Sequence, residues 1–264
     1  MNPTNPGSTR RRSRFPPARS ASPEGVIAFG GTPDAETLKE AYGRGIFPWP
    51  HRDVPLLWFC PDPRFVLDLG AVRISRSLRK DLRRRRFEIR ADTDFEGVIH
   101  ACAESPREGQ GGTWITADLI AGFRALHAEG IAHSIEAWRD GRLVGGLYGL
   151  SLGEIFFGES MFAREGNASK VAFATLLANL IQWRFPLVDC QSYTPHLASF
   201  GAEDWPRSRF LARLKGALRS PTRQGPWSLE LGPRDAAELF ARRAAELGDE
   251  EGDGPPSLGW DSGE

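Results

Sequence analysis

The sequence predicts an α+β fold in which a small N-terminal domain precedes a larger domain of strands and helices. Three observations predict the α+β class: apolar residues that alternate along strands, apolar residues at helical spacing, and an Asp-Gly hairpin turn between two strands. A meander of strands followed by a helix and a further strand is typical of an α+β domain. The 264 residues allow one large domain or two small ones.

The two ends of the chain lack the apolar periodicity of a folded domain. Residues 1–20 are rich in Pro, Ser and Arg, and we expect them to form a disordered basic tail. Residues 231–264 contain nine acids and three arginines, and we expect them to be mostly disordered, with a short helix around Ala236–Leu247. The expected domains are therefore a small N-terminal domain over 21–63 and a larger domain over 64–230.

The N-terminal domain is expected to be small and rich in loops. Thr32-Pro33-Asp34 predicts a helix start with Pro in the first turn, and the helix should end near Tyr42, before Gly43 or Gly45. Aromatic residues between prolines follow in Ile46–Pro50 and Leu56–Phe59, and they indicate loops.

The larger domain is expected to begin with a strand over Phe65–Leu69 and a basic helix that Ser75 caps. A second helix should contain apolar residues at i, i+3, i+4 and i+7, which are Phe95, Val98, Ile99 and Cys102. Thr116 should cap a third helix, with Gly130 as its stop.

The meander of this domain should consist of three strands joined by short turns. The predicted strands are His133–Arg139, Arg142–Leu150 and Glu154–Glu159, and Asp140-Gly141 is the hairpin turn. A helix that Asn167 caps should then run to about Trp183, and a last strand should cover Pro186–Gln191.

Charge and cysteine content restrict the class of protein. The chain has 34 basic and 34 acidic residues, so only local charge can indicate a nucleic-acid partner. Cys60, Cys102 and Cys190 form no Cys-x-x-Cys pair, so we expect a reducing cytoplasm and neither a disulfide scaffold nor a zinc site. No apolar run approaches the ~20 residues of a membrane helix, and the histidines show no metal-ligand spacing.

A basic helix face is the strongest local concentration of charge. Residues 73–90 contain nine basic residues and two acids. Like charges at helical spacing repel, and a phosphate backbone would offset that repulsion. The spacing therefore favours phosphate contact over base readout, although a basic face that is only solvated is the alternative. The residues concerned are Arg76, Lys80, Arg83 and Arg84.

Polar residues in the last predicted strand form the best candidate site. Asp189 and Gln191 share one face, and Cys190, on the other face, is expected to belong to the core. A buried Asp is costly without a partner, so Asp189 is either a site residue or a structural carboxylate bonded to backbone. Glu159 follows Gly158, where backbone can approach a ligand closely.

Trp114 follows the glycine-rich Gly111-Gly112-Thr113 and precedes a helix cap. A tryptophan in such a loop stacks on a base or sugar, or simply anchors the loop.

Ten short segments spread over about residues 22–215 form one ordered set, and the two tails lie outside it. The segments are Gly45–Trp49, Trp58 with Pro61–Arg64, Ile74–Ser77, Gly112–Thr116, His133–Glu136, Leu143–Gly146, Gly158–Phe162, Asn167–Lys170, Asp189–Gln191, and Ala198-Ser199 with Gly201. In this order they resemble the bacterial leucyl/phenylalanyl-tRNA–protein transferase family.

The resemblance implies a small N-terminal domain followed by a domain of the acetyltransferase-like (GNAT) fold, which uses neither CoA nor another cofactor. It implies transfer of Leu or Phe, less readily Met, from aminoacyl-tRNA to proteins with N-terminal Arg or Lys, which marks them for N-end-rule degradation. In the implied roles, Asp189 accepts or relays the proton of the acceptor α-amine, and Gln191 orients the amine or the carbonyl. Glu159 helps to hold the reacting groups or the basic acceptor side chain.

The resemblance also implies binding residues. Trp49 and Trp114 match tryptophans at the 3′-terminal adenosine, and the basic helix matches the one that meets the acceptor stem. The apolar aminoacyl pocket is expected to be lined by Leu147, Phe156, Met161, Phe173, Leu180 and Val188. Four departures from the family pattern bear on amino-acid preference and tRNA affinity: Phe123 for Tyr, Leu147 for Met, Leu180 for Phe, and a longer loop at Gln110–Gly112.

Three other functions are alternatives to this one. An acyl-CoA transferase would need a pyrophosphate loop, and the segment 142–147 lacks its last small residue and leads into a strand. A cell-wall aminoacyltransferase typically duplicates the fold, whereas one copy fits here. A non-catalytic RNA-binding module would explain the basic helix but not Asp189, Gln191 and Glu159 together.

Overall fold

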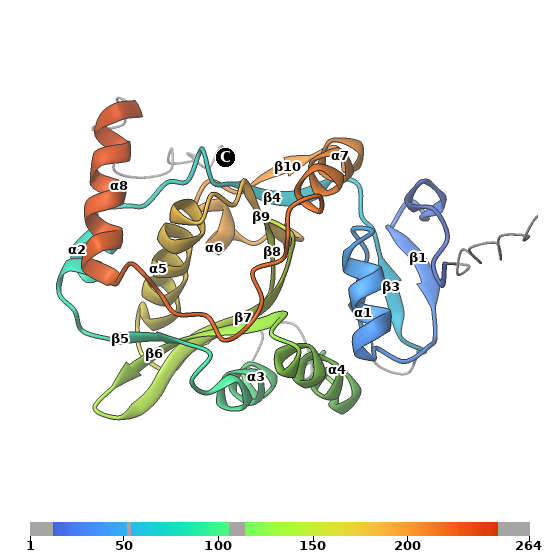
Figure 1. The fold of residues 1–264 in the computed structure, drawn as a ribbon, viewed down its shortest axis with the longest axis horizontal. Helices are drawn as coiled ribbons and strands as arrows, with labels where there is room; N and C mark the ends of the chain where they lie inside the picture. Colours follow the sequence, from blue (N-terminus) through green and yellow to red (C-terminus); the bar gives the residue numbers. More distant parts are fainter. Residues whose placement is uncertain (1–12, 52–53, 106–113, 248–264) are drawn as a thin grey trace, which may run out of the picture.

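The structure, a computed structural model, describes residues 13–51, 54–105 and 114–247 (Figure 1). A three-stranded sheet of order β1-β3-β2 belongs to the small N-terminal domain, and a seven-stranded sheet of order β10-β4-β9-β8-β7-β6-β5 forms the larger one. The predicted α+β class with a small N-terminal domain is confirmed. The first part of the predicted basic tail, the loop Gly111-Gly112-Thr113 and the end of the predicted acidic tail lie outside the described residues.

The N-terminal domain contains β1 (Val26–Phe29), α1 (Ala35–Tyr42), β2 (Phe47–Trp49) and β3 (Leu57–Phe59). The segments predicted as loops therefore contain two paired strands, β2 and β3. Pro48 fits in β2 because this strand lies at the edge of the sheet, where a missing N–H is tolerated. Asp34 caps α1 by accepting from the Thr37 amide at 2.8 Å, so Pro33 precedes the helix instead of occupying its first turn.

The folded body begins before residue 21. Phe15 is buried, and its ring lies 4.9 Å from that of Trp58. A short 3-10 helix follows over Ala18–Ser20. The part of the predicted tail from Ser13 onward is therefore packed against the N-terminal domain, because the Phe15 side chain is buried against Trp58.

The seven-stranded sheet carries the meander that the sequence predicted. Strands β5 to β8 are antiparallel, and β9 pairs parallel to β8 after the crossover helix α5 (Ala168–Gln182). Asp140 and Gly141 both have positive φ, as a two-residue hairpin turn of this kind requires. The strands are β4 (Arg64–Asp68), β5 (Glu88–Ala91), β6 (Ala132–Arg139), β7 (Arg142–Leu152), β8 (Ile155–Ala163), β9 (Leu187–Gln191) and β10 (Glu203–Trp205).

Helices cover both faces of this sheet. In Figure 1, α3 (Phe95–Glu104) and α4 (Ala117–Ala128) lie on one side, and α5 lies on the other with α2 (Arg76–Arg83) and α8 (Pro233–Leu247) beside it. Leu147 and Tyr148 are consecutive residues of β7, so their side chains point to opposite faces of the sheet. They accordingly belong to two different core clusters, one on each face. The short α6 (Pro195–Ala198) and α7 (Arg207–Ala217) follow β9 and β10.

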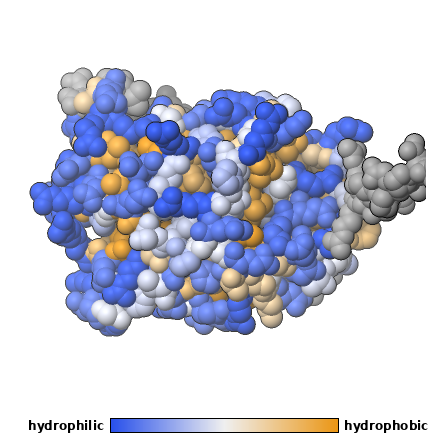
Figure 2. Space-filling model, in the orientation of Figure 1, coloured by the Kyte–Doolittle hydropathy of each residue, from blue (hydrophilic) through white to orange (hydrophobic). Residues whose placement is uncertain are grey.

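The short helix predicted around Ala236–Leu247 is present as α8, which begins three residues earlier, at Pro233. The chain from residue 231 to the end of α8 is therefore folded, and the expected disorder does not apply to the residues just before the helix. Ala236, Ala237 and Phe240 share one buried face of the helix. That face contacts α2 and α5, so the helix is held by apolar packing in spite of the acidic residues around it. Figure 2 shows mainly hydrophilic residues at this end of the molecule.

The helix α5 starts where the sequence predicted, but not by the predicted cap. Asn167 has φ of 66° and makes no side-chain cap to the helix. Its Nδ2 instead donates to Asp81 Oδ2 of α2 at 2.8 Å.

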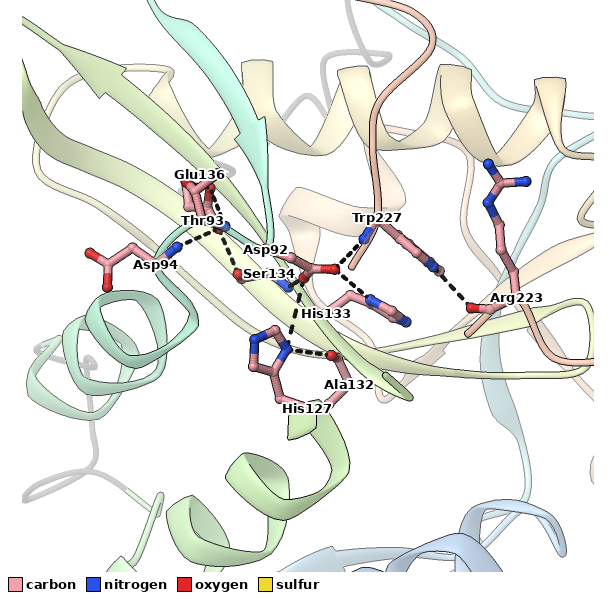
Figure 3. A network of polar contacts seen from close by, with 10 residues as sticks. All are labelled: Asp92, Thr93, Asp94, His127, Ala132, His133, Ser134, Glu136, Arg223 and Trp227. Atoms are coloured by element: carbon pink, nitrogen blue, oxygen red, sulfur yellow. Dashed lines mark hydrogen bonds and ion pairs between the residues drawn. The ribbon is translucent and has the colours of Figure 1, made fainter. Parts of the chain in front are cut away.

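A buried polar network joins the C-terminal segment to the sheet (Figure 3). The Asp92 carboxylate accepts from His133 Nδ1 at 2.8 Å, from the Ser134 amide at 2.8 Å and from the Trp227 amide at 2.6 Å. The His133 and Trp227 rings stack with centroids 3.8 Å apart. One carboxylate thereby fixes the end of β5, the start of β6 and the segment that leads to α8.

None of the helices in the part of the chain that the structure describes is long and apolar enough to span a membrane.

Candidate active site

A cavity of about 380 Å³ lies between the two domains. It forms where β8 and β9 separate: the two strands pair from Ile155/Leu187 to Phe157/Asp189 and no further. Beyond that point Gly158 and the end of β9 diverge, and side chains of β2, α5 and α6 close the space. The topology thus brings both strand ends that carry the predicted catalytic residues to one cavity.

The three predicted catalytic residues line this cavity together. Gln191 Nε2 donates to Glu159 Oε1 at 2.6 Å, and the Gln191 amide donates to Asp189 Oδ1 at 3.0 Å. Gln191 has φ of 64°, so strand alternation ends at this residue. Cys190 therefore also lines the cavity, which the simple alternation of faces did not predict, but burial raises the pKa of its thiol and keeps it from acting as a nucleophile.

Asp189 is fully buried and paired with Arg64, a residue to which the sequence analysis gave no role. Arg64 Nε and Nη2 donate to the two carboxylate oxygens at 2.8 and 2.6 Å, and Nη1 donates to the Gly45 carbonyl at 3.1 Å. The guanidinium also lies 4.7 Å from the ring centres of Phe47 and Phe210. This bidentate pair supplies the partner that a buried Asp requires, and it occupies both Asp189 oxygens.

The two oxygens of the Glu159 carboxylate differ in their hydrogen bonds. Oε1 accepts from Tyr42 Oη and from Gln191 Nε2, each at 2.6 Å, whereas the buried Oε2 has no hydrogen-bond partner among the residues that the structure describes. Burial raises the pKa of Glu159 to about 8, although the two donated hydrogen bonds lower it. The cavity therefore contains a carboxylate that can take up a proton near neutral pH.

Tyr42 is a second residue that the sequence analysis missed as a site residue. It ends α1, is fully buried, and reaches from the N-terminal domain to Glu159. The only signal in the sequence is its position at the helix end before Gly43, which gives no indication of a partner 117 positions away.

Four of the six residues predicted for the aminoacyl pocket line this cavity. Leu147, Met161, Phe173 and Val188 line the cavity. Phe156 and Leu180 do not: both are fully buried in the core cluster, and Phe156 lies near Trp227. Leu197 and His196 of α6 complete the wall, and no pattern in the sequence indicated them.

The two predicted adenosine-binding tryptophans also lie at this cavity. Trp49 of β2 and Trp114 before α4 both line it and are partly exposed. They come from different domains, so a planar group between them would contact both domains at once.

The four predicted acceptor-stem residues lie on α2 and not in the cavity. Arg76, Lys80, Arg83 and Arg84 are all exposed, and Leu78 and Leu82 are buried on the opposite face. Arg84 is the C-cap of α2, and its Nη1 lies 3.4 Å from Asp81 Oδ1 of that helix. Figure 1 shows α2 beside α8 at one end of the molecule, with the N-terminal sheet at the other.

No group of three or more His, Cys, Asp or Glu residues within the described ranges is placed to hold a metal ion. The cavity instead has apolar walls and a buried proton acceptor. An α+β fold with this site defines a class of enzyme that holds an apolar group next to a base, as acyl transfer to an amine requires.

Comparison with known proteins identifies the family within this class. Residues 66–215 match the family model described as leucyl/phenylalanyl-tRNA protein transferase, and residues 31–62 match the model of its N-terminal domain. The chain belongs to this family, which confirms the resemblance seen in the sequence.

Curated relatives agree with the family models. A Myxococcus xanthus protein named leucyl/phenylalanyl-tRNA–protein transferase is 53% identical over 81% of this chain and 92% of its own length. A Thiobacillus denitrificans protein of the same name is 51% identical over 83% of this chain and 96% of its own.

Proposed function

We propose that this chain transfers Leu or Phe, less readily Met, from aminoacyl-tRNA to the α-amine of proteins that begin with Arg or Lys. The reaction needs no cofactor, takes place in the cytoplasm and marks the acceptor for N-end-rule degradation. Family membership supports the substrates, since the relatives are named for this transfer. The observation that carries the mechanism is the unpaired Glu159 Oε2 at an apolar cavity.

The reaction joins an amine to an ester that is already activated. The α-amine has a reference pKa of about 8 and must lose a proton before it attacks the carbonyl carbon. We assign that proton to Glu159 Oε2. The C–N bond then forms, the bond from the carbonyl carbon to the ribose oxygen breaks, and the second amine proton leaves with the ribose hydroxyl. Glu159 finally releases its proton to solvent.

Asp189 acts through its neighbours in this mechanism. Both of its oxygens are held by Arg64, and Oδ1 also accepts from the Gln191 amide. This arrangement supports a role in positioning Gln191, whose side chain in turn holds Glu159. Gln191 lies between the carboxylates of Asp189 and Glu159, and from there it orients the acceptor amine or the carbonyl of the aminoacyl ester.

The donor is held by apolar and aromatic contacts. We propose that the Leu or Phe side chain lies against Leu147, Met161, Phe173 and Val188, and that Phe156 and Leu180 support this wall from the core. Fully burying such a side chain contributes roughly 1.5–3 kcal/mol. Trp49 and Trp114 would contact the terminal adenosine.

The larger domain is proposed to have the acetyltransferase-like (GNAT) fold. The antiparallel β5–β8 meander, the crossover helix α5 and the parallel β8–β9 pair that opens into the site support this assignment.

The test is transfer of radiolabel to a protein that begins with Arg. The purified chain should transfer label from Leu-tRNA and Phe-tRNA, but not from Val-tRNA, without ATP, and an acceptor that begins with Gly should receive none. Binding of tRNA without transfer to either acceptor would instead support an RNA-binding module.

A further inference from the structure

The C-terminal helix α8 is attached to the loop that leads into the basic helix α2. Arg243 of α8 donates from Nη2 to the carbonyl oxygens of Leu69 and Gly70, which precede α2, at 2.9 Å each. This contact lies about one turn before the last residue of α8, Leu247. Because α2 itself also packs against α8, the residues after Leu247 follow a helix that is fixed both to α2 and to the loop before it.

The residues that follow α8 carry charge of a single sign. Residues 248–264, which we call the acidic segment, contain six acids and no Lys, Arg or His. Four of these acids come directly after the helix, at Asp249, Glu250, Glu251 and Asp253. Residues 73–90, which include α2, instead contain nine basic residues and two acids. The acidic segment and the basic face of α2 are therefore complementary in charge.

The helices α2 and α8 contain cationic groups that the described residues leave without an acceptor. Within these residues no carboxylate pairs with Lys80 or Arg83, both of which are exposed. Arg79 of α2 and Arg243 of α8 each have a buried Nε that lacks a hydrogen-bond partner in the same part of the chain. A buried donor without an acceptor is costly, so these two helices indicate an anionic ligand.

The acidic segment is long enough to reach this face. The helix α8 has 15 residues, which corresponds to a length of about 22 Å. Because α2 packs against the side of α8, its basic face lies within roughly that distance of Leu247. A Gly-rich chain as long as residues 248–264 spans roughly 20–25 Å between its ends. Tethering at this range gives an effective concentration on the order of millimolar.

We propose that the acidic segment binds the basic face of α2 in the free chain and competes there with the phosphates of tRNA. This inference rests on the proposed function, in which α2 meets the acceptor stem. The segment lowers the affinity for every polyanion that α2 binds. An aminoacyl-tRNA displaces it because its aminoacyl end gains further contacts in the cavity, whereas an RNA without that end gains none. The segment makes no contribution to the chemical step.

The test is filter binding of uncharged tRNA to the full chain and to a chain that ends at Leu247. At low salt we expect the shorter chain to bind about tenfold more tightly, because a tethered competitor is lost. Its advantage should shrink as salt is added, since the acids that tRNA displaces regain counterions in the full chain. A full-length chain with the six acids replaced by Asn and Gln should bind like the shorter chain. A chain with the same 17 residues in permuted order should bind like the parent.

A second comparison locates the contact on α2. In Arg83→Gln/Arg84→Gln the acids have fewer cations to bind, so removal of residues 248–264 should improve tRNA binding by a smaller factor than in the parent. Arg142→Gln/Arg219→Gln, outside α2, should keep the parental factor. Equal affinities with and without the segment would overturn the proposal, as would the same factor in the α2 variant, which would assign the effect to net charge alone. Both results come from binding, so they are distinct from a failure of the proposed function, in which the chain binds tRNA and transfers nothing.

Discussion

Two carboxylates meet Gln191 in one cavity, and their surroundings divide their roles. Asp189 is neutralised by the buried Arg64, which holds both of its oxygens. Within the described ranges, Glu159 accepts on one oxygen from two neutral donors, Tyr42 and Gln191, and has no hydrogen-bond partner on the other. Because ionised groups need compensation when they are buried, the second carboxylate is the one that is ready to hold a proton.

Replacing Glu159 by Gln should lower activity and raise stability at pH 8. We expect kcat to fall about 100-fold or more, because the proton acceptor is lost. The raised pKa means that the folded chain binds this proton more tightly than the unfolded chain, so Glu159 lowers stability progressively as the pH rises from 4.5 toward about 8. The variant should therefore melt at a higher temperature than the parent at pH 8. A melting temperature that is unchanged or lower at pH 8 would contradict this account of the buried carboxylate.

The same variant gives a pH test. Below a pKa of about 8 Glu159 is protonated and cannot accept a proton, so kcat/KM for the acceptor should rise from pH 6.5 to 8 in the parent. Initial rates measured in Glu159→Gln should show a flatter rise, due to the amine alone. Identical profiles for the two proteins would assign the proton to another group.

The pair of Asp189 and Arg64 should matter to folding as well as to function. Arg64→Leu leaves a buried carboxylate without its cation, and we expect a loss of about 3 kcal/mol in the free energy of unfolding. Arg64→Leu/Asp189→Leu removes both charges and should recover part of that loss in a denaturant titration. A double variant that is less stable than the single one would show that the two residues stabilise the fold mainly through their other hydrogen bonds, to Gly45 and Gln191.

At the scale of the elements, the basic face of α2 depends on tertiary packing. This helix has eight residues, too few to be stable alone, and its exposed charges repel one another. Its principal neighbour among the described elements is α8, which lies outside the residues that the family models match. The C-terminal helix of this chain therefore supports the helix that we propose for the acceptor stem.

Neutralising that face should weaken tRNA binding without regard to sequence. We expect Arg83→Gln/Arg84→Gln to lower the affinity for Leu-tRNA and for Phe-tRNA by the same factor, because only phosphates are contacted. The dependence of affinity on salt concentration should become shallower, by the release of about one to two fewer counterions. Filter binding over a range of salt concentrations measures this. Arg142→Gln/Arg219→Gln, which removes two exposed arginines outside α2, is the control. An effect on one tRNA alone would indicate base recognition.

Elements with strong local signals could be predicted from the sequence, and pairings across the chain could not. The meander, its Asp-Gly turn and the helix α5 follow from periodicity and turn chemistry. The strand β2 was missed because its proline suggested a loop. The helix α8 was predicted around Ala236–Leu247 and begins three residues earlier, at Pro233. Asp189, Gln191 and Glu159 were found as polar residues at strand ends, whereas Arg64 lies 125 positions from Asp189 and depends on the pairing of β4 with β9.

At the scale of the whole molecule, the Asp92 network attaches the segment before α8 to the sheet (Figure 3). His133 is buried within it, and this burial lowers its pKa below 6.5, although the bond to Asp92 raises it. The folded chain therefore takes up this proton less readily than the unfolded chain. Stability should be lost as the pH falls through 6.5, the pKa of the unfolded state.

Replacing His133 tests this linkage. We expect His133→Gln to lower stability at pH 7, since the buried stack on Trp227 is altered, but to reduce the loss between pH 7 and 5.5. Thermal melts across this range measure both effects. His100→Gln, at a histidine that is exposed on α3, should keep the slope of the parent. A parental slope in His133→Gln would place the acid sensitivity elsewhere.

We propose that the cavity between β8 and β9 holds the aminoacyl end of the tRNA. A crystal structure with an adenosine that carries Leu through a stable 3′-amide would show where this end binds. We expect the Leu side chain to lie among Leu147, Met161, Phe173 and Val188, the adenine to lie against Trp49 or Trp114, and the carbonyl to lie within reach of an amine at Glu159. Density for the ligand outside this cavity, or in it with the carbonyl turned away from Glu159, would show that the chemistry takes place elsewhere.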